Sequence, residues 1–486
     1  MAADVESRAG STAAFAVFAA IFALSAILYS LGLGADSLGA SEAYSAMAAA
    51  KPNVASIVQI PLDHDPGKQI LYYTLLHFWS RVFGTSEGAL RSLSVLFALV
   101  GLFLVFALGR EMFDDGTGVA AAAIWAFNPV AMVFSHRARM YSMFIAIALG
   151  HLLALWRTRE RPTAARAGTC GVLGATLLYT HMGGIIIVGT EAGLLMRDWL
   201  RGRRNPMAWL GLAGAIVLFL PWLPIARSQS QALVNGHWLD WIGPPQDYSI
   251  AIRAVVAAGA GAIALWILLA RAREEDADEP LRWCAAWSLL PTIAFAAGSI
   301  VIRPMFHIRY VVPAAAVVAI AVAGVLGRID ARLRNLAAAA VAAALIILYP
   351  FDRPIVQPWR KIAEMVAGAG ASEPVFFESG YVSSGAAARM PNPGFPFGYY
   401  SIPFDYYFHG SNPRITVPGF DPSSARNAIE NGVAHAGGGW LISWKGENEA
   451  GEELPDRGQF RSAIELRGQR IIVYRILPIG KASGIS

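Results

Sequence analysis

A short polar segment between two apolar runs brings together a histidine and two arginines. His136, Arg137 and Arg139 follow an apolar run that ends near Phe134 and precede one that starts near Met140. An arginine guanidinium donates two parallel hydrogen bonds and therefore suits a phosphate group. Charged groups at membrane depth are costly and usually face a cavity, a partner or a ligand. The segment predicts recognition of a lipid phosphate, with ordinary anchoring of helix ends by lipid headgroups as the alternative.

Carboxylates that could act as a general base gather in the loop after the first apolar run. Glu42 and Asp65 are the two candidates for the catalytic base, and His64 adjoins the second. A carboxylate at a membrane interface has limited access to water and could take a proton from an acceptor hydroxyl. The alternative is that these acids are solvated loop residues, which we favour for Asp36.

A divalent metal ion is one further use for these side chains. His64, Asp65 and His181 could bind such an ion together with Glu42. No local ligand spacing supports this site, and a single histidine at a helix end, such as His181, more often forms an interfacial hydrogen bond. The sequence therefore leaves the need for a cofactor open.

The composition indicates a membrane protein. Of the 486 residues, 55% are hydrophobic and only 15% are charged, whereas soluble domains carry about 25% charged residues. The net charge of +5 comes with basic residues that lie between apolar runs, so it does not indicate nucleic-acid binding. Cys170 and Cys284 both fall within apolar runs, which makes a disulfide framework improbable.

The apolar runs predict about eleven membrane-spanning helices. We place them near 12–33, 88–109, 117–134, 140–156, 167–181, 183–197, 207–226, 249–270, 283–302, 310–327 and 335–350. Arginines crowd the loops around 157–166, 197–204, 271–282 and 328–334, which all fall on one side of this arrangement. The positive-inside rule makes that side cytoplasmic.

The opposite side collects the polar residues that topology does not explain. Candidate residues for binding a substrate or lipid phosphate there are His64, His136, Arg137, Arg139, Tyr141, His181, His307 and Arg309. The stretch 69–83 predicts an amphipathic helix at this interface. The chain shows no internal repeat, so an inverted-repeat transporter is disfavoured.

Two domains are expected. Residues 1–350 form a transmembrane domain with a large first extracytoplasmic loop, 34–87, and residues 351–486 form a small soluble α/β domain. In this second domain we predict strands near 375–378, 440–444 and 470–474, alternating with helices near 358–368, 423–435 and 458–467. The segment 391–409, rich in Pro, Gly, Phe and Tyr, is expected to be an ordered loop.

Several motifs resemble the GT-C glycosyltransferases of the protein-mannosyltransferase and aminoarabinose-transferase type, glycosyltransferase family 39-like. Ser41-Glu42-Ala43-Tyr44-Ser45 is similar to their Asp-Glu-x-Phe/Tyr-Ser motif, and Arg137-Ala138-Arg139-Met140-Tyr141 is similar to their Glu-Ala-Arg-Met-Tyr motif. Further similar stretches are Leu71 to Trp79, Phe83 to Arg91, Tyr179 to His181, and Arg309-Tyr310 with Pro313. The resemblance covers roughly 12–350. The chain departs from it at Ser41 and Arg137, where the family carries acids.

The resemblance implies a GT-C-like fold and sugar transfer from a polyprenyl-phosphate donor to an extracytoplasmic lipid, glycan or protein acceptor. It also implies that an acid of the first loop, here Glu42 or Asp65, is the base, and that basic residues hold the lipid phosphate. The expected location is a bacterial inner membrane, with the C-terminal domain in the periplasm. A non-catalytic protein that binds a lipid-linked glycan or scaffolds an envelope polysaccharide pathway is the alternative, because two family acids are missing. A lipid or solute transporter is a third, less favoured possibility.

Overall fold

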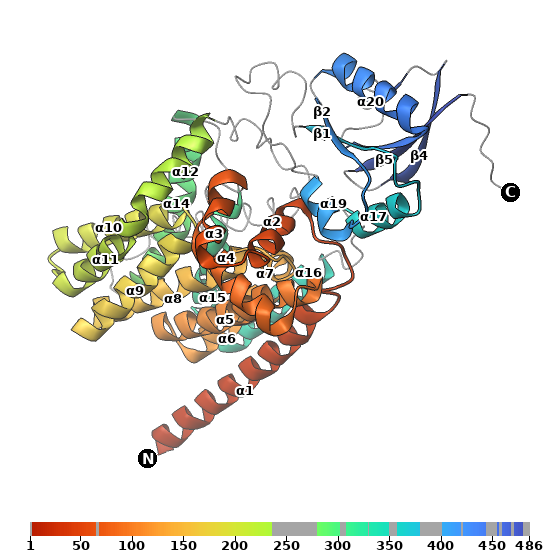
Figure 1. The fold of residues 1–486 in the computed structure, drawn as a ribbon. Coiled ribbons are helices and arrows are strands. Elements are labelled where there is room, and N and C mark those ends of the chain that lie inside the picture. The colour runs from red at the N-terminus through yellow and green to blue at the C-terminus, as the bar shows by residue number, and fades with distance from the viewer. Residues whose placement is uncertain are drawn as a thin grey trace. The chain divides into compact units, whose positions relative to one another are not determined.

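A computed structural model describes the protein over residues 2–64, 68–235, 279–301, 308–328, 330–348, 357–379, 401–418, 421–443, 454–455, 459–467 and 471–479. Its elements are labelled in Figure 1. The chain divides into two compact units, which are treated separately. The first unit is helical and includes Lys51–Gln231. The second combines Gly34–Ala50 with the residues after Pro350, so part of the expected first loop groups with the C-terminal domain.

The first unit consists of helices. Their bounds are α1 (Ala2–Ser30), α3 (Val54–Ile57), η1 (Ile60–His64), α4 (Ile70–Phe83), α5 (Glu87–Met112), α6 (Asp115–Ala126), α7 (Pro129–Ser135), α8 (Tyr141–Glu160), α9 (Ala164–Thr180), α10 (Gly184–Leu200), α11 (Pro206–Phe219), η2 (Leu220–Trp222), α12 (Leu223–Asn235), α14 (Glu279–Val301), η6 (Ile308–Tyr310), α15 (Val312–Leu326) and α16 (Ala331–Ile347). The apolar run predicted at 249–270 lies outside the described residues.

Polar caps start many of these helices. The side chains of Ser86, Thr163 and Asn205 each accept a hydrogen bond from a backbone N–H three residues further on, at the starts of α5, α9 and α11. Such caps satisfy N–H groups that have no partner within the helix. At α7, Asn128 caps the helix and Pro129 follows at its first position. These two residues break the single run predicted at 117–134, so α6 and α7 meet at an angle of 61°.

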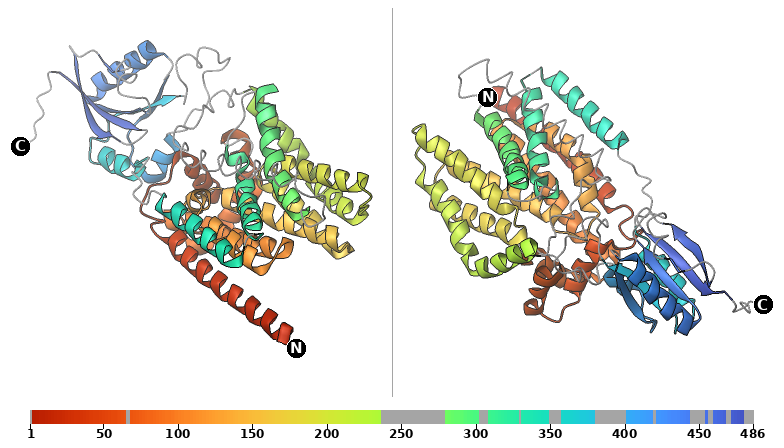
Figure 2. Two further views of the ribbon diagram at one scale, coloured as in Figure 1. Left: turned by 180° about the vertical axis from the view of Figure 1, so that it is seen from behind. Right: turned by 90° about the horizontal axis from the view of Figure 1, so that it is seen from above.

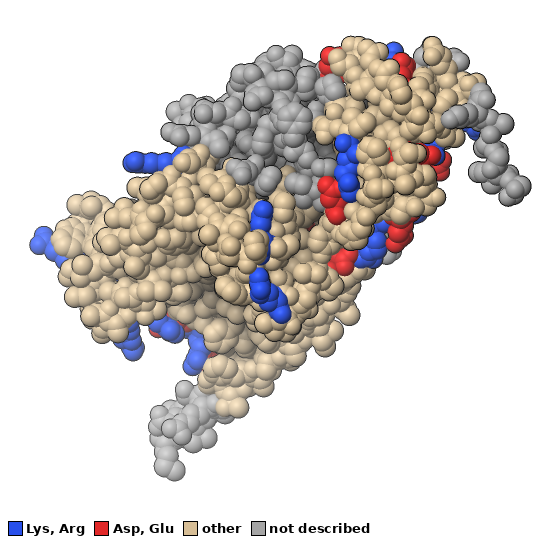
Figure 3. All heavy atoms as spheres, viewed as in Figure 1, with Lys and Arg blue, Asp and Glu red and all other residues tan. Residues whose placement is uncertain are grey.

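Apolar surface and close helix packing fit a lipid environment. Among the described residues, four helices are long and apolar enough to cross a membrane, or five if α6 and α7 count as one. The face of these helices drawn in Figure 3 carries few charged side chains. Figure 2 shows α9 and α11, in yellow and yellow-green, side by side. They can approach closely because Gly211 has no side chain; a Cβ at this position would lie only 3.0 Å from the Cβ of Cys170.

The second unit is a five-stranded sheet covered by helices. Its elements are α2 (Ala40–Ala49), α17 (Trp359–Ala367), β1 (Val375–Ser379), α19 (Ser401–Tyr407), β2 (Arg414–Pro418), α20 (Pro422–Ala436), β3 (Gly439–Ser443), β4 (Phe460–Arg467) and β5 (Ile472–Pro478). The strand order is β2-β1-β3-β5-β4. The strands β2, β1 and β3 are parallel, with Val375 opposite both Arg414 and Trp440, while β5 pairs antiparallel with β3 and β4.

Two apolar layers cover the faces of this sheet. Trp359 and Phe404, from α17 and α19, pack with Phe377 on one face. Ile429 and Val433 of α20 pack with other strand residues on the opposite face (Figure 1). The helices predicted at 358–368 and 423–435 are therefore present, as are the strands predicted near 375, 440 and 470.

Three predictions for this domain need correction or completion. The helix predicted at 458–467 is wrong, because β4 occupies this stretch and alternates between more buried and exposed side chains as it pairs with β5. Strand β2 was not expected. Within the predicted loop 391–409, residues 401–407 form α19, and 391–400 lie outside the described residues.

Candidate functional site

The turn between α9 and α10 places His181 at the centre of a buried polar cluster. Its side chain is fully buried, and its backbone pairs with that of Lys68 in an isolated β-bridge. The backbone N–H of Gly183 donates to Nδ1 of His181 at 3.0 Å. In the neutral imidazole the proton therefore lies on Nε2, which has no hydrogen-bond partner among the described residues. The cluster thus contains a buried N–H that is available to a ligand.

Close packing leaves little freedom in this turn. A Cβ on Gly183 would lie 3.0 Å from the carbonyl oxygen of Tyr310 and 3.1 Å from Nδ1 of His181. The ring of Phe144 lies with its centroid 4.8 Å from that of His181, and the Tyr310 ring lies at 5.3 Å. Any side chain in place of Gly183 would push these groups apart. The orientation of the His181 imidazole is therefore set by its surroundings.

Arg139 enters the same cluster from the polar segment before α8. Its side chain is buried, and Nη1 donates to the hydroxyl of Tyr73 at 3.3 Å. The hydroxyl of Ser94 donates to the carbonyl oxygen of Arg139 at 3.3 Å and lies 3.2 Å from the hydroxyl of Tyr72. Residues of α4 and α5 therefore hold the arginine in place.

Two more cations lie around the ring of Tyr310. Lys68 is buried, with Nζ 5.5 Å from the ring centroid, and the guanidinium carbon of Arg309 lies 5.7 Å away. Phe295 stacks on this ring at 5.5 Å. Gln229 donates to the carbonyl oxygen of Lys68 at 3.1 Å, which fixes the backbone that carries it. These cation–π contacts hold the two cationic side chains close to the Tyr310 ring.

The three cations act electrostatically on His181. Burial, followed by the charges of Lys68, Arg309 and Arg139, lowers the pKa of the His181 imidazole well below its ordinary value of about 6.5. The imidazole is therefore neutral at neutral pH. A cluster of three cations and one neutral N–H donor can bind a multiply charged oxyanion such as a phosphate.

A pH series tests this environment. Unfolded chains take up a proton on histidine below about pH 6.5, whereas His181 in the folded protein stays neutral, so acid favours unfolding. The contribution of the neutral His181 to the free energy of unfolding is fully present above this pH and decreases as the pH drops below it. At pH 5.5 we expect the free energy of unfolding of the wild type to have fallen by roughly 1.4 kcal/mol more than that of His181→Asn. Thermal unfolding of the two proteins would measure this difference. Equal losses in the two proteins would show that His181 is not held neutral.

Other predicted residues take different places in the helical unit. Tyr141 is buried against Phe134, with ring centroids 4.7 Å apart, and its ring lies 6.3 Å from that of His181. The two ring nitrogens of His136 lie 2.9 Å and 3.1 Å from the carbonyl oxygens of Met132 and Leu31. His136 thus links the end of α7 to the end of α1. Arg137 is half-buried, and its side chain forms no hydrogen bond or ion pair within the described part of the chain.

Neither of the two predicted bases, Glu42 and Asp65, is among the described residues of the helical unit. Glu42 belongs to the second unit, where its buried carboxylate accepts the backbone N–H of Gly39 at 2.9 Å and so caps α2. Asp65 and His307 lie outside the described residues, as does the side chain of His64. Among the residues that are described, no group of three or more His, Cys, Asp or Glu side chains could hold a metal ion.

Three members of the cluster around His181 were not predicted from the sequence: Lys68, Tyr73 and Tyr310. Lys68 directly precedes the amphipathic helix predicted at 69–83. Its burial came from pairing with a turn far along the chain, and no local pattern predicts such pairing. A lone lysine directly before an apolar helix was the available signal.

A second polar network, also not anticipated, lies inside the helical bundle. His151 of α8 and Glu191 of α10 are fully buried, with Nε2 and Oε2 2.8 Å apart. Nε1 of Trp287 on α14 donates to the other carboxylate oxygen at 2.9 Å. Nδ1 of His151 lies 3.1 Å from the carbonyl oxygen of Cys170 on α9. The network joins four helices, and the signal for it was a single His and a single Glu within apolar runs.

Residues 67–225 match the family model described as dolichyl-phosphate-mannose-protein mannosyltransferase. No curated protein matches the sequence of the chain. Among solved structures, ArnT from Cupriavidus metallidurans in the apo state is similar, with a TM-score of 0.60 and 15% identity over 95% of this chain and 98% of that one.

The same ArnT bound to undecaprenyl phosphate is similar with a TM-score of 0.57 and 15% identity, over 94% of this chain and 97% of that one. The likeness extends over both the helices and the small sheet domain, since it covers nearly all of either chain. The matched family segment contains Lys68, Arg139 and His181. The chain thus has an ArnT-like fold, that of a helix-rich polytopic membrane protein with a small C-terminal sheet, and its residues 67–225 match the mannosyltransferase family model.

Proposed function

We propose that the protein is a membrane glycosyltransferase that transfers a sugar from a polyprenyl-phosphate donor to an extracytoplasmic lipid, glycan or protein acceptor. The observation that carries this proposal is the convergence of Lys68, Arg139 and Arg309 on His181, a combination of charges suited to binding a phosphate. The resemblance supports a bacterial inner membrane as its location, and the arginine-rich loops support an orientation with the C-terminal domain in the periplasm. The fold's likeness to an ArnT crystallised with undecaprenyl phosphate supports the choice of donor.

The reaction is a displacement at the anomeric carbon of the donor sugar. An oxygen of the acceptor forms a bond to this carbon, the bond from the carbon to the phosphate oxygen breaks, and the acceptor proton passes to a carboxylate. Negative charge grows on the departing polyprenyl phosphate, where the three cations and the Nε2–H of His181 would stabilise it. The positive cluster is preorganised by Tyr73, Ser94 and Gly183, so little rearrangement is needed as the charge develops.

Glu42 and Asp65 are the two candidates for the general base of this reaction. General-base catalysis contributes typically 10²- to 10⁴-fold, so we expect the double variant Glu42→Gln/Asp65→Asn to lose about 1,000-fold in transfer rate. The assay would use purified protein in nanodiscs with a panel of undecaprenyl-phosphate-linked monosaccharides, and would detect release of undecaprenyl phosphate by mass spectrometry. The matched control is Asp36→Asn, an exposed acid of the same loop, for which we expect little change. Full activity in the double variant would show that neither acid is the base.

One observation favours a second function, binding of a lipid-linked glycan without catalysis. The carboxylate of Glu42 accepts the Gly39 N–H and so has a structural role as a helix cap. Ser41 and Arg137 also stand where related proteins carry acids. The two functions separate in the same assay: turnover of any donor by wild-type protein excludes the binding function, whereas saturable donor binding without turnover across the panel supports it.

A further inference from the structure

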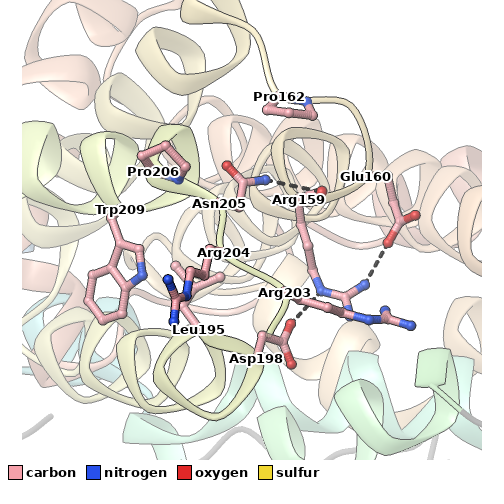
Figure 4. Close-up of a pocket in the computed structure, with 10 residues that line it drawn as sticks. All are labelled: Arg159, Glu160, Pro162, Leu195, Asp198, Arg203, Arg204, Asn205, Pro206 and Trp209. Atoms are coloured by element: carbon pink, nitrogen blue, oxygen red, sulfur yellow. Dashed lines mark hydrogen bonds and ion pairs between the residues drawn. The ribbon is translucent and has the colours of Figure 1, made fainter. Parts of the chain in front are cut away.

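The arginine-rich end of the helical bundle contains a pocket that the proposed transfer reaction does not use. It lies where α8 and α10 end and α11 begins, and it has a volume of about 270 Å³. Figure 4 shows Arg159 and Asp198 at its base, with Arg203, Arg204 and Trp209 around it. We propose that this pocket, which we name the arginine pocket, binds the headgroup of an anionic phospholipid from the adjacent leaflet.

Acidic and arginine side chains neutralise one another at the base of the arginine pocket. Arg159, whose side chain is 6% exposed, contacts Asp198 at 2.6 Å and Glu279 at 2.8 Å. Arg197 also contacts Asp198, at 2.8 Å. Asn205 donates to the carbonyl oxygen of Thr158 at 2.9 Å and so ties the start of α11 to the end of α8. The acids beneath the pocket are thus paired with arginines and do not set its charge.

The rim of the arginine pocket carries the charge that a ligand would meet. Arg203 and Arg204 are exposed, and both line the pocket. Glu160 is the acid on the rim; its side chain is 50% exposed and contacts Arg159 at 2.5 Å. Among the described residues that line the pocket, the exposed charged side chains are thus two arginines and one acid. The first turn of α11 adds the positive end of a helix dipole next to Asn205.

Apolar side chains beside the rim explain why we choose a lipid over a free anion. Leu200 and Leu210 are 78% and 57% exposed at the end of α10 and the start of α11, and Met196 is 47% exposed one turn before. Trp199, which lies next to the Arg204 guanidinium at 5.9 Å, is 38% exposed. Exposed leucines fit acyl chains, and tryptophan with arginine is typical of the headgroup level. Basic pockets between membrane helices bind anionic headgroups in this way.

The test is retention of a defined lipid by the full-length protein. Detergent-purified protein would be mixed with dioleoyl phosphatidylglycerol or dioleoyl phosphatidylcholine, and bound lipid counted by native mass spectrometry. We expect wild-type protein to prefer phosphatidylglycerol, and Arg203→Gln/Arg204→Gln to reduce its retention roughly 10-fold. Glu160→Gln removes the rim acid and should raise retention about 3-fold. This increase cannot result from a misfolded variant.

The matched control is Arg328→Gln/Arg332→Gln, which removes the same charge from exposed arginines outside the pocket. We expect this control to retain phosphatidylglycerol like the wild type. Equal losses in the two double variants would overturn the proposal, because general surface charge would explain the binding. Displacement of the lipid by excess inorganic phosphate, or equal retention of phosphatidylcholine, would also overturn it. The transfer reaction could fail its own test without affecting this outcome.

Discussion

Replacing Arg139 with alanine is expected to weaken the binding of undecaprenyl phosphate on the order of 100-fold, about 2.7 kcal/mol. The guanidinium is buried and held by Tyr73, so its interaction with a phosphate takes place away from water, where charge-assisted hydrogen bonds are strongest. Its charge is also one of three that act on His181. Affinity can be measured by microscale thermophoresis of the purified protein with undecaprenyl phosphate.

Matched variants separate this effect from loss of charge in general. Arg81→Ala removes an exposed arginine, which donates to the carbonyl oxygen of Pro52 at 3.3 Å, and should leave the affinity unchanged. Arg137→Ala should have a smaller effect than Arg139→Ala, because Arg137 is half-buried and its side chain forms no hydrogen bond or ion pair within the described region. If Arg139→Ala bound the lipid as tightly as Arg81→Ala, the phosphate would not lie in this cluster. Such a result would contradict the proposed binding site.

Glu191→Leu is expected to destabilise the helical bundle by about 3 kcal/mol or more. The substitution leaves His151 and Trp287 without the carboxylate that both contact, at 2.8 Å and 2.9 Å. Both partners are fully buried, so a polar group that loses its hydrogen bond in the bundle cannot form a new one with water. The thermal unfolding midpoint in detergent would report the loss.

Two further variants decide whether the buried pair itself is responsible. Glu111→Leu removes an acid from an exposed pair with Arg157, 2.9 Å apart, and should change stability by less than about 1 kcal/mol. His151→Leu/Glu191→Leu removes both members of the buried pair and should be more stable than Glu191→Leu alone, because no uncompensated polar partner of the pair remains. Identical midpoints for Glu191→Leu and wild type would mean that the network contributes nothing to stability.

The helices were predictable because the signals for them are local. Apolar runs of sufficient length predicted α5, α8 and α9 close to their observed ends, since hydropathy and capping act within a few residues. The bend between α6 and α7 was missed although its cause, Asn128 followed by Pro129, is also local. The motif Arg137 to Tyr141 likewise indicated a resemblance to the GT-C family, and the role of Arg139 in binding a phosphate stays a prediction.

Strand β4 shows where local patterns fail. Residues 458–467 contain enough apolar positions for a helix, and only pairing with β5 makes them a strand. Such pairing depends on residues elsewhere in the chain and on the register between the two strands. The same reason explains β2, a short strand that exists because it extends a parallel sheet through β1.

The sequence by itself indicated the class of this protein: its apolar runs predict a lipid environment, its arginine-rich loops predict an orientation, and its motifs resemble those of GT-C proteins. Tertiary structure alone decided which polar residues meet. Lys68 lies beside His181 because a backbone bridge joins two distant segments. Glu191 and His151 are 40 residues apart in the chain and contact each other between two packed helices. Glu42 joins the second unit rather than the helical one for the same kind of reason. Contacts of this type depend on packing between segments, which no spacing of residues along the chain encodes.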